Sequence, residues 1–163
     1  TPLLEVVATF QERFDSGDID GYEAIFHPMS GYVSGRDATS SWFVAVTGLV
    51  AERQCELVDT TQVRCTETQR SGLEPGTVSE PFATVWNGAD GYIWTIEFPD
   101  GPSTFGSTSV GVGVPEYRAW VEQNEPDKFG ELFTGVAMQL GTEALRSAHS
   151  EMIATYLAAT GRG

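Results

Sequence analysis

The sequence predicts an α+β fold in which helices cover one face of an antiparallel β-sheet. Apolar residues recur at helical spacing before residue 50 and again after Pro115. Between these parts, from Gln54 to Phe98, β-branched and aromatic residues indicate a meander of strands. Helices and strands come in separate runs and do not alternate, which is typical of α+β proteins. We therefore expect one domain spanning residues 1–163, long enough to bury a core.

Three helices are predicted in the N-terminal part. Their apolar faces are formed by Leu3, Val7, Phe10 and Phe14 in the first, by Ile19, Tyr22 and Phe26 in the second, and by Trp42, Val46 and Leu49 in the third. Asp18 is expected to cap the second helix and Pro28 to end it. Residues 31–34 between the second and third helices are compatible with a brief strand.

The first predicted hairpin contains both cysteines of the chain. Reflection about Thr60 places Cys55 opposite Cys65 and Leu57 opposite Val63. All four side chains lie on one face, because strand side chains alternate with a period of two residues. Two cysteines that face each other across a hairpin predict a disulfide, which persists in oxidising compartments. Glu67 follows Cys65 by two residues and therefore shares its face, unless a bulge intervenes.

The second predicted hairpin joins 82–86 to 92–98 through residues 87–91, where Asn-Gly and Asp-Gly pairs supply the positive φ angles of a turn. Tyr92, Trp94, Ile96 and Phe98 share a face that we expect to meet the core. Ile93, Thr95 and Glu97 are then expected on the wetter face. Trp42, Trp94 and Trp120 are predicted to be mostly buried, each on the apolar face of its element.

The C-terminal part predicts an irregular segment followed by helices. Residues 101–113 are rich in Gly, Ser and Thr, and we expect an edge strand with irregular ends there. Pro115 then opens a helix, residues 129–133 form a short continuation, and Gly141-Thr142 precede a last helix that ends before Gly161.

Charge limits the classes of partner. The net charge of −14, from 9 basic and 23 acidic residues, argues against nucleic acid and against an anionic membrane surface. No apolar run has the length of about 18 residues that a membrane span needs. The chain begins at Thr1, which is consistent with removal of a signal peptide or with another trimmed start. Together with the cysteine pair, this favours an exported protein, with a cytoplasmic one as the alternative.

Three stretches, taken in order, carry a family resemblance: residues 10–28, the cysteine hairpin with residues 90–93, and residues 117–126 with the terminal helix at 153–157. Through these stretches the chain resembles the SnoaL-like (polyketide cyclase-like) branch of the nuclear transport factor 2-like superfamily. The resemblance implies a cone, in which a strongly curved antiparallel sheet wraps around the N-terminal helices and leaves an apolar pocket. Extra C-terminal helices would cap this cone or build a dimer interface. Relatives include isomerases, cyclases, hydrolases and non-enzymes, so the resemblance fixes no single chemistry.

Glu67 is the candidate catalytic residue. If its face points into the pocket, burial would raise its pKa above the ordinary value of about 4.3 and suit it to proton transfer. The alternative is a surface position or a pair with an arginine. Tyr22 and His27 are its candidate partners, and Trp42 and Glu97 are further pocket candidates. His149 is a weaker catalytic candidate than His27.

No cofactor or metal site is predicted, because neither histidine has a second one at ligand spacing. Nucleotide-binding and hydrolase motifs are not found, and the Asp-Arg-Asp arrangement of epoxide hydrolases is not evident. The preferred function is binding of a small hydrophobic molecule. An acid/base enzyme acting on such a molecule, of isomerase, cyclase or hydrolase type, is the first alternative. A non-catalytic interaction module working as a homodimer is the second.

Overall fold

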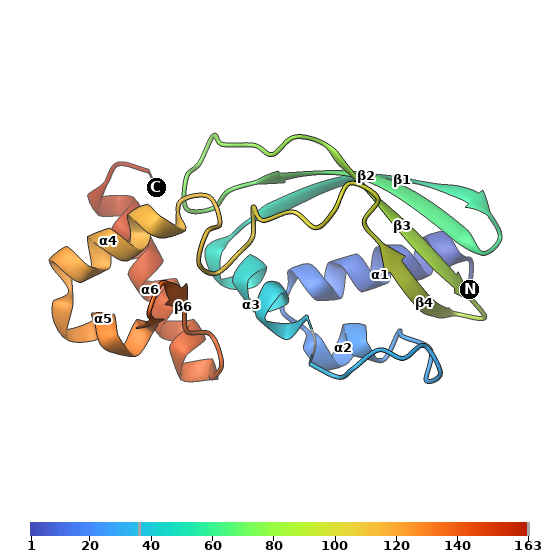
Figure 1. Ribbon diagram of the computed structural model, residues 1–163, viewed down its shortest axis with the longest axis horizontal. Helices are drawn as coiled ribbons and strands as arrows, with labels where there is room; N and C mark the ends of the chain where they lie inside the picture. Colours follow the sequence, from blue (N-terminus) through green and yellow to red (C-terminus); the bar gives the residue numbers. More distant parts are fainter. Residues whose placement is uncertain (36, 163) are drawn as a thin grey trace.

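The computed structural model describes residues 1–35 and 37–162 and confirms the α+β class with an antiparallel sheet. The elements, in chain order, are α1 (Leu3–Asp15), α2 (Ile19–Glu23), α3 (Ala38–Thr47), β1 (Val50–Asp59), β2 (Gln62–Arg70), β3 (Phe82–Ala89), β4 (Tyr92–Glu97), α4 (Val114–Asn124), α5 (Pro126–Leu132), β5 (Phe133–Thr134), β6 (Ala137–Met138) and α6 (Glu143–Ala159). Figure 1 shows α1 lying along one face of the four-stranded sheet, while α4, α5 and α6 gather at the opposite end of the molecule. Among the described helices, none is both long and apolar enough to cross a membrane.

The sheet has the strand order β1-β2-β3-β4, with every neighbouring pair antiparallel. The predicted register of the first hairpin is confirmed, because Cys55 pairs with Cys65 and Leu57 pairs with Val63. The two sulfur atoms lie 2.01 Å apart, at disulfide bonding distance, as predicted. This crosslink joins the two strands on the face that meets α1, where Cys65 is fully buried.

The predicted faces of the second hairpin are wrong for its first residues. The turn is the Asp90-Gly91 pair, with φ angles of 55° and 81°, whereas the Asn87-Gly88 pair lies inside β3. There the register shifts by one residue, so that Trp94 is the extra residue of a bulge. Consequently Ile93 is fully buried in the core, while Trp94 is 38% exposed. The other two tryptophans predicted to be buried, Trp42 and Trp120, are partly buried.

Neither the edge strand expected at residues 101–113 nor the brief strand that residues 31–34 would allow is found. Residues 101–113 consist of turns and irregular backbone, and residues 31–34 also lack strand structure. Instead, the chain just after α2 pairs with the edge of the sheet through a bridge between Phe26 and Ile93. The Ile93 N–H donates to the Ile25 carbonyl at 2.9 Å, and the His27 N–H donates to the Ile93 carbonyl at 2.9 Å. These bonds cover part of the β4 edge that would otherwise be open.

The buried apolar side chains form two clusters. One fills the space between α1, α2 and the inner face of the sheet, with Phe10, Tyr22 and Trp86 among its members. The other lies among α3, α4, α5 and α6, with Tyr117 and Tyr156 among its members. Phe14, near the end of α1, packs against both clusters and so connects them.

His149 is buried in the second cluster and makes two hydrogen bonds. Its Nε2 lies 2.8 Å from the Leu132 carbonyl oxygen, and its Nδ1 lies 2.9 Å from the Tyr117 hydroxyl. Because a carbonyl only accepts, Nε2 carries the proton, and Nδ1 accepts the hydroxyl proton of Tyr117. This pairing requires neutral imidazole. Burial lowers the pKa of His149, although the Leu132 carbonyl opposes the shift.

We predict that this histidine makes folding stability depend on pH. Its folded-state pKa lies below the unfolded value of about 6.5, so its contribution is complete above that value. The contribution is lost as the pH falls toward the folded-state pKa, by up to about 1.4 kcal/mol per pH unit. Urea unfolding between pH 7.5 and 5.5 should show this loss in the native protein and a flatter profile in His149→Asn. His27→Gln, which changes the only other histidine of the chain, separates the contributions of the two imidazoles. An unchanged slope in His149→Asn would contradict the prediction.

Candidate functional site

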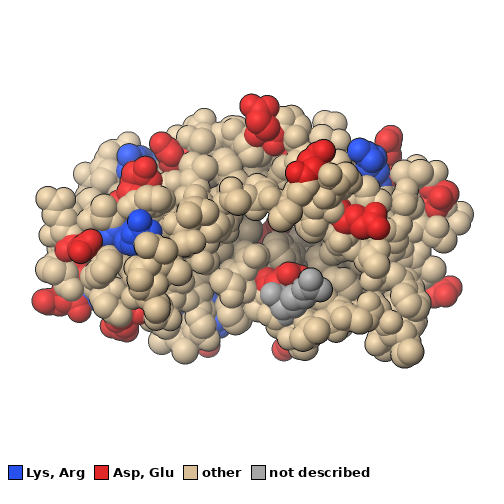
Figure 2. Space-filling view, viewed as in Figure 1, with Lys and Arg blue, Asp and Glu red and all other residues tan. Residues whose placement is uncertain are grey.

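A cavity of about 550 Å³ lies between the inner face of the sheet and the N-terminal helices. Its walls come from α1 and α3, from residues 26–32 together with Asp37, from all four sheet strands and from residues 98–106. Figure 2 shows a hollow in this side of the molecule, with acidic side chains in red at its opening. The volume falls within the range of roughly 300–1,000 Å³ that is typical of small-molecule sites.

Aromatic side chains dominate the apolar part of the lining. They are Phe10, Phe14, Phe26, Tyr32, Phe82, Trp86, Trp94 and Phe98. Phe10 stands at the centre of this group, with its ring 5.2 Å from that of Trp86 and 5.3 Å from that of Phe26. Phe26 in turn stacks on Tyr32 at 3.9 Å. These contacts fix the rings before any ligand enters, which lowers the entropic cost of binding.

Four polar residues, Asp15, Arg53, Glu67 and Gln69, form one hydrogen-bonded group in the lining, here called the polar cluster. Arg53 donates from both Nη atoms to Asp15, at 2.7 and 2.9 Å, and from Nε to Glu67 Oε1 at 2.6 Å. Gln69 donates from Nε2 to Glu67 Oε2 at 2.8 Å. The guanidinium therefore lies between two carboxylates, one of which it holds in bidentate geometry.

The polar cluster is largely withdrawn from solvent. The side chains of Arg53 and Glu67 are 14% and 8% exposed, and that of Asp15 is 32% exposed. Burial acts against the charge of Arg53, but its contacts with Asp15 and Glu67 outweigh that effect and raise the pKa of the guanidinium. Arg53 thus remains a cation inside the cavity wall.

Strand register explains how the cluster assembles. Arg53 pairs directly with Glu67 across β1 and β2, two residues before the Cys55–Cys65 pair on the same face. Gln69 follows on that face, and Asp15 is the last residue of α1. The side chain of Gln11, one turn before Asp15, donates to the Cys65 sulfur at 3.5 Å. The disulfide therefore packs against α1 immediately beside the cluster.

The predicted site residues do not come together in one place. Glu67 lines the cavity and is 6% exposed, paired with arginine. Tyr22 is fully buried behind Phe10 and Phe14 and does not line the cavity; burial raises the pKa of its hydroxyl, as does the Tyr32 hydroxyl beside it. His27 stacks on Trp94 at 3.9 Å outside the lining.

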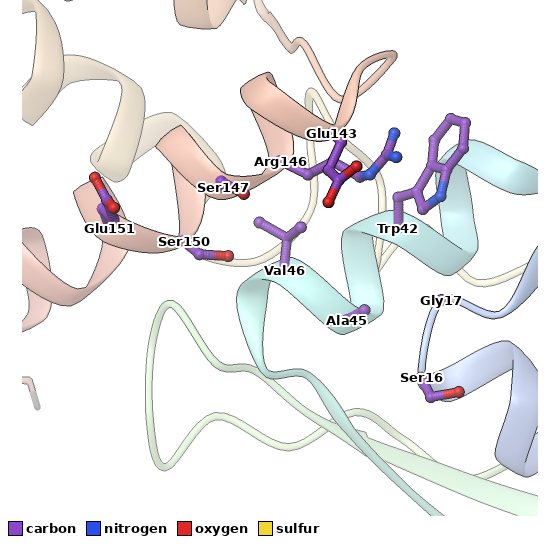
Figure 3. A pocket seen from close by; sticks show the side chains of 10 residues that line it. All are labelled: Ser16, Gly17, Trp42, Ala45, Val46, Glu143, Arg146, Ser147, Ser150 and Glu151. Atoms are coloured by element: carbon purple, nitrogen blue, oxygen red, sulfur yellow. The ribbon is translucent and has the colours of Figure 1, made fainter.

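Glu97 and Trp42 also lie away from the polar cluster. Glu97 is exposed and pairs with Val85. The adjacent pair, Trp86–Ile96, faces inward, and successive side chains of a strand point to opposite faces, so Glu97 lies on the outer face of the sheet. Trp42 lines a different, open groove between α3 and α6 (Figure 3). There the Arg146 guanidinium lies 4.2 Å from the centre of its ring, a cation–π contact that joins the two helices.

Sequence reasoning missed Asp15 and Arg53. The signal for Arg53 was available, because the reflection that pairs Cys55 with Cys65 also pairs Arg53 with Glu67. Asp15 had no such signal, since its contact with Arg53 joins residues that are 38 positions apart. No group of three or more His, Cys, Asp or Glu side chains in the described part of the chain is arranged to hold a metal ion.

Comparisons with known proteins do not identify a family. No protein-family model matches the chain, and neither a curated protein nor a solved structure gives a significant match. The geometry of the cavity itself is therefore the basis for proposing a function.

We predict that Arg53 stabilises the fold much more than an exposed arginine of the same sheet. Arg53→Met would leave Glu67 buried without its cation. The expected loss is about 2–3 kcal/mol, less than for a fully buried pair because Asp15 is partly exposed. Arg70→Met is the matched control, since its 3.8 Å pair with Glu52 is mostly exposed and should be worth less than about 0.5 kcal/mol. Equal losses for both variants in denaturant unfolding would contradict this assignment.

Proposed function

We propose that the cavity binds a small, mostly apolar molecule. The observation that carries this proposal is the preorganised aromatic lining around a space of about 550 Å³, with polar groups confined to one cluster. Small-molecule sites commonly combine an apolar wall with a few fixed polar groups that orient the ligand. The aromatic rings would supply the binding energy by burying apolar surface. The polar cluster would set the ligand's orientation.

A second function is favoured by one specific observation, the carboxylate–guanidinium–carboxylate arrangement of Asp15, Arg53 and Glu67. A carboxylate in the lining is the kind of group that acts as a general base, and a guanidinium beside it can stabilise negative charge that develops on a substrate. The protein would then be an acid/base enzyme acting on the bound molecule. In that case Arg53, which is bonded to Glu67, and Asp15, which is bonded to Arg53, would replace Tyr22 and His27 as its partners. Turnover that Glu67→Gln abolishes without loss of binding would support this function.

We also propose that the chain is a divergent SnoaL-like member of the nuclear transport factor 2-like superfamily. The support is the element order, with three helices before four antiparallel strands and α1 lying along the inner face. The cysteine pair supports a site of action in an oxidising compartment, as expected for an exported protein. The outer face of the sheet is the surface that a homodimer of the interaction-module type would use.

The binding proposal predicts that a neutral hydrophobic probe enters this cavity. N-phenyl-1-naphthylamine should bind with one-to-one stoichiometry and quench tryptophan fluorescence, since Trp86 and Trp94 line the space. Ala51 lies on the inner face of β1 and lines the cavity, so Ala51→Phe would fill part of it. Affinity should fall at least about tenfold, because overfilling costs roughly 1–3 kcal/mol.

Thr66→Phe is the control for this experiment, because Thr66 is exposed on the opposite face of the neighbouring strand. It adds the same aromatic surface without entering the cavity and should leave the affinity unchanged. Undetectable binding to the native protein, or equal affinity in the two variants, would refute binding in this cavity.

A further inference from the structure

The polar cluster contains more acidic than basic groups. Its charged side chains are Asp15, Arg53 and Glu67, two acidic against one basic, and all three line the cavity. Within the polar cluster, Arg53 is already bonded to both Asp15 and Glu67. One guanidinium cannot neutralise two carboxylates, so the cluster retains net negative charge. Because the side chains of Arg53 and Glu67 are largely withdrawn from solvent, such a charge acts on a ligand more strongly than it would at the surface.

The side chain of Gln69 contributes a buried acceptor that receives no hydrogen bond from the described residues. Its Nε2 donates to Glu67 Oε2, and this bond fixes which end of the amide carries the oxygen. The oxygen, Oε1, is buried and has no hydrogen-bond donor among the described residues. A buried acceptor left unpaired is costly, and a donor supplied by a ligand or by water would remove that cost.

The aromatic wall favours the same kind of ligand. The faces of aromatic rings carry partial negative charge and attract cations, most strongly for Trp. Trp86 and Trp94 both line the cavity, together with the phenylalanine and tyrosine rings named above. The net charge of −14 on the whole chain adds a long-range potential that draws cations in and repels anions.

From these three observations we infer that the ligand is an apolar amine that carries a positive charge. Its hydrophobic body lies against the aromatic wall, and its protonated amino group donates to the acceptors of the polar cluster. An anionic ligand, such as a fatty acid, is disfavoured by the same charges. This inference rests on the proposed binding function and names the chemical class of the ligand.

Three probes with one apolar body test the inference: 2-naphthylmethylamine, 2-naphthylmethanol and 2-naphthoate, which are cationic, neutral and anionic at pH 7. Calorimetric titration of the native protein should give the tightest binding for the amine. Its affinity should exceed that of the alcohol by about tenfold, in line with a desolvated cation–π and charge contribution. The naphthoate should bind more weakly than the alcohol.

Two variants locate the source of the preference. Glu67→Gln removes one negative charge from the polar cluster and should bring the affinity of the amine close to that of the alcohol. Glu97→Gln makes the same change in net charge on the outer face of the sheet and should leave the preference intact. Asp15→Asn provides the same test should Glu67→Gln prove unfolded by circular dichroism.

The possible outcomes distinguish failure of the amine assignment from failure of the binding function on which it rests. Equal or tighter binding of the alcohol or the naphthoate would overturn the assignment to amines and leave the binding function standing. Failure of all three probes to bind would overturn both. An amine preference that persists in folded Glu67→Gln, or in Asp15→Asn where it takes the place of that variant, would overturn the role given to the polar cluster.

Discussion

The bidentate contact of Arg53 with Asp15, continued by its bond to Glu67, is the interaction on which the site depends. It joins the C-terminal end of α1 to two adjacent strands at the point where the helix leaves the sheet. The position of α1 above the sheet sets the depth of the cavity, because Phe10 and Phe14 on that helix form part of its wall. A change in this contact therefore alters both the packing of the helix and the chemistry of the cavity.

The disulfide and Gln11 support the same region. Cys55 and Cys65 join β1 to β2 two residues from the Arg53–Glu67 pair, and Gln11 contacts both sulfur atoms from α1. These contacts restrict relative movement of the strands and the helix, so the polar cluster is held on rigid elements. The irregular residues 98–106 close another side of the cavity and have no such crosslink among the described contacts. Under the proposed binding function, entry of a ligand would be accommodated more easily there than at the polar cluster.

The sequence predicted those features that follow from local periodicity. The Cys55–Cys65 register follows from a two-residue strand period and one short turn, and it placed Glu67 on the same face as Cys65. The position of Trp94 could not be derived in this way, because a single extra residue at a bulge reverses the faces on one side of it. Gly88 shows why the bulge is there. A Cβ at this position would lie 2.3 Å from the Tyr92 carbonyl oxygen and 2.8 Å from the Leu3 side chain, so glycine permits a close approach to α1. Such contacts, like that of Asp15, depend on tertiary packing.

The placement of Arg53 between Asp15 and Glu67 can be measured through the Nε–Hε signal of Arg53 in nuclear magnetic resonance spectra, assigned with an Arg53→Lys variant. We expect a resolved signal at neutral pH that exchanges slowly with water, because its proton is donated to buried Glu67. In Glu67→Gln the exchange should become faster and the chemical shift should move. Exchange in the native protein as rapid as for a solvent-exposed arginine such as Arg70 would contradict the account.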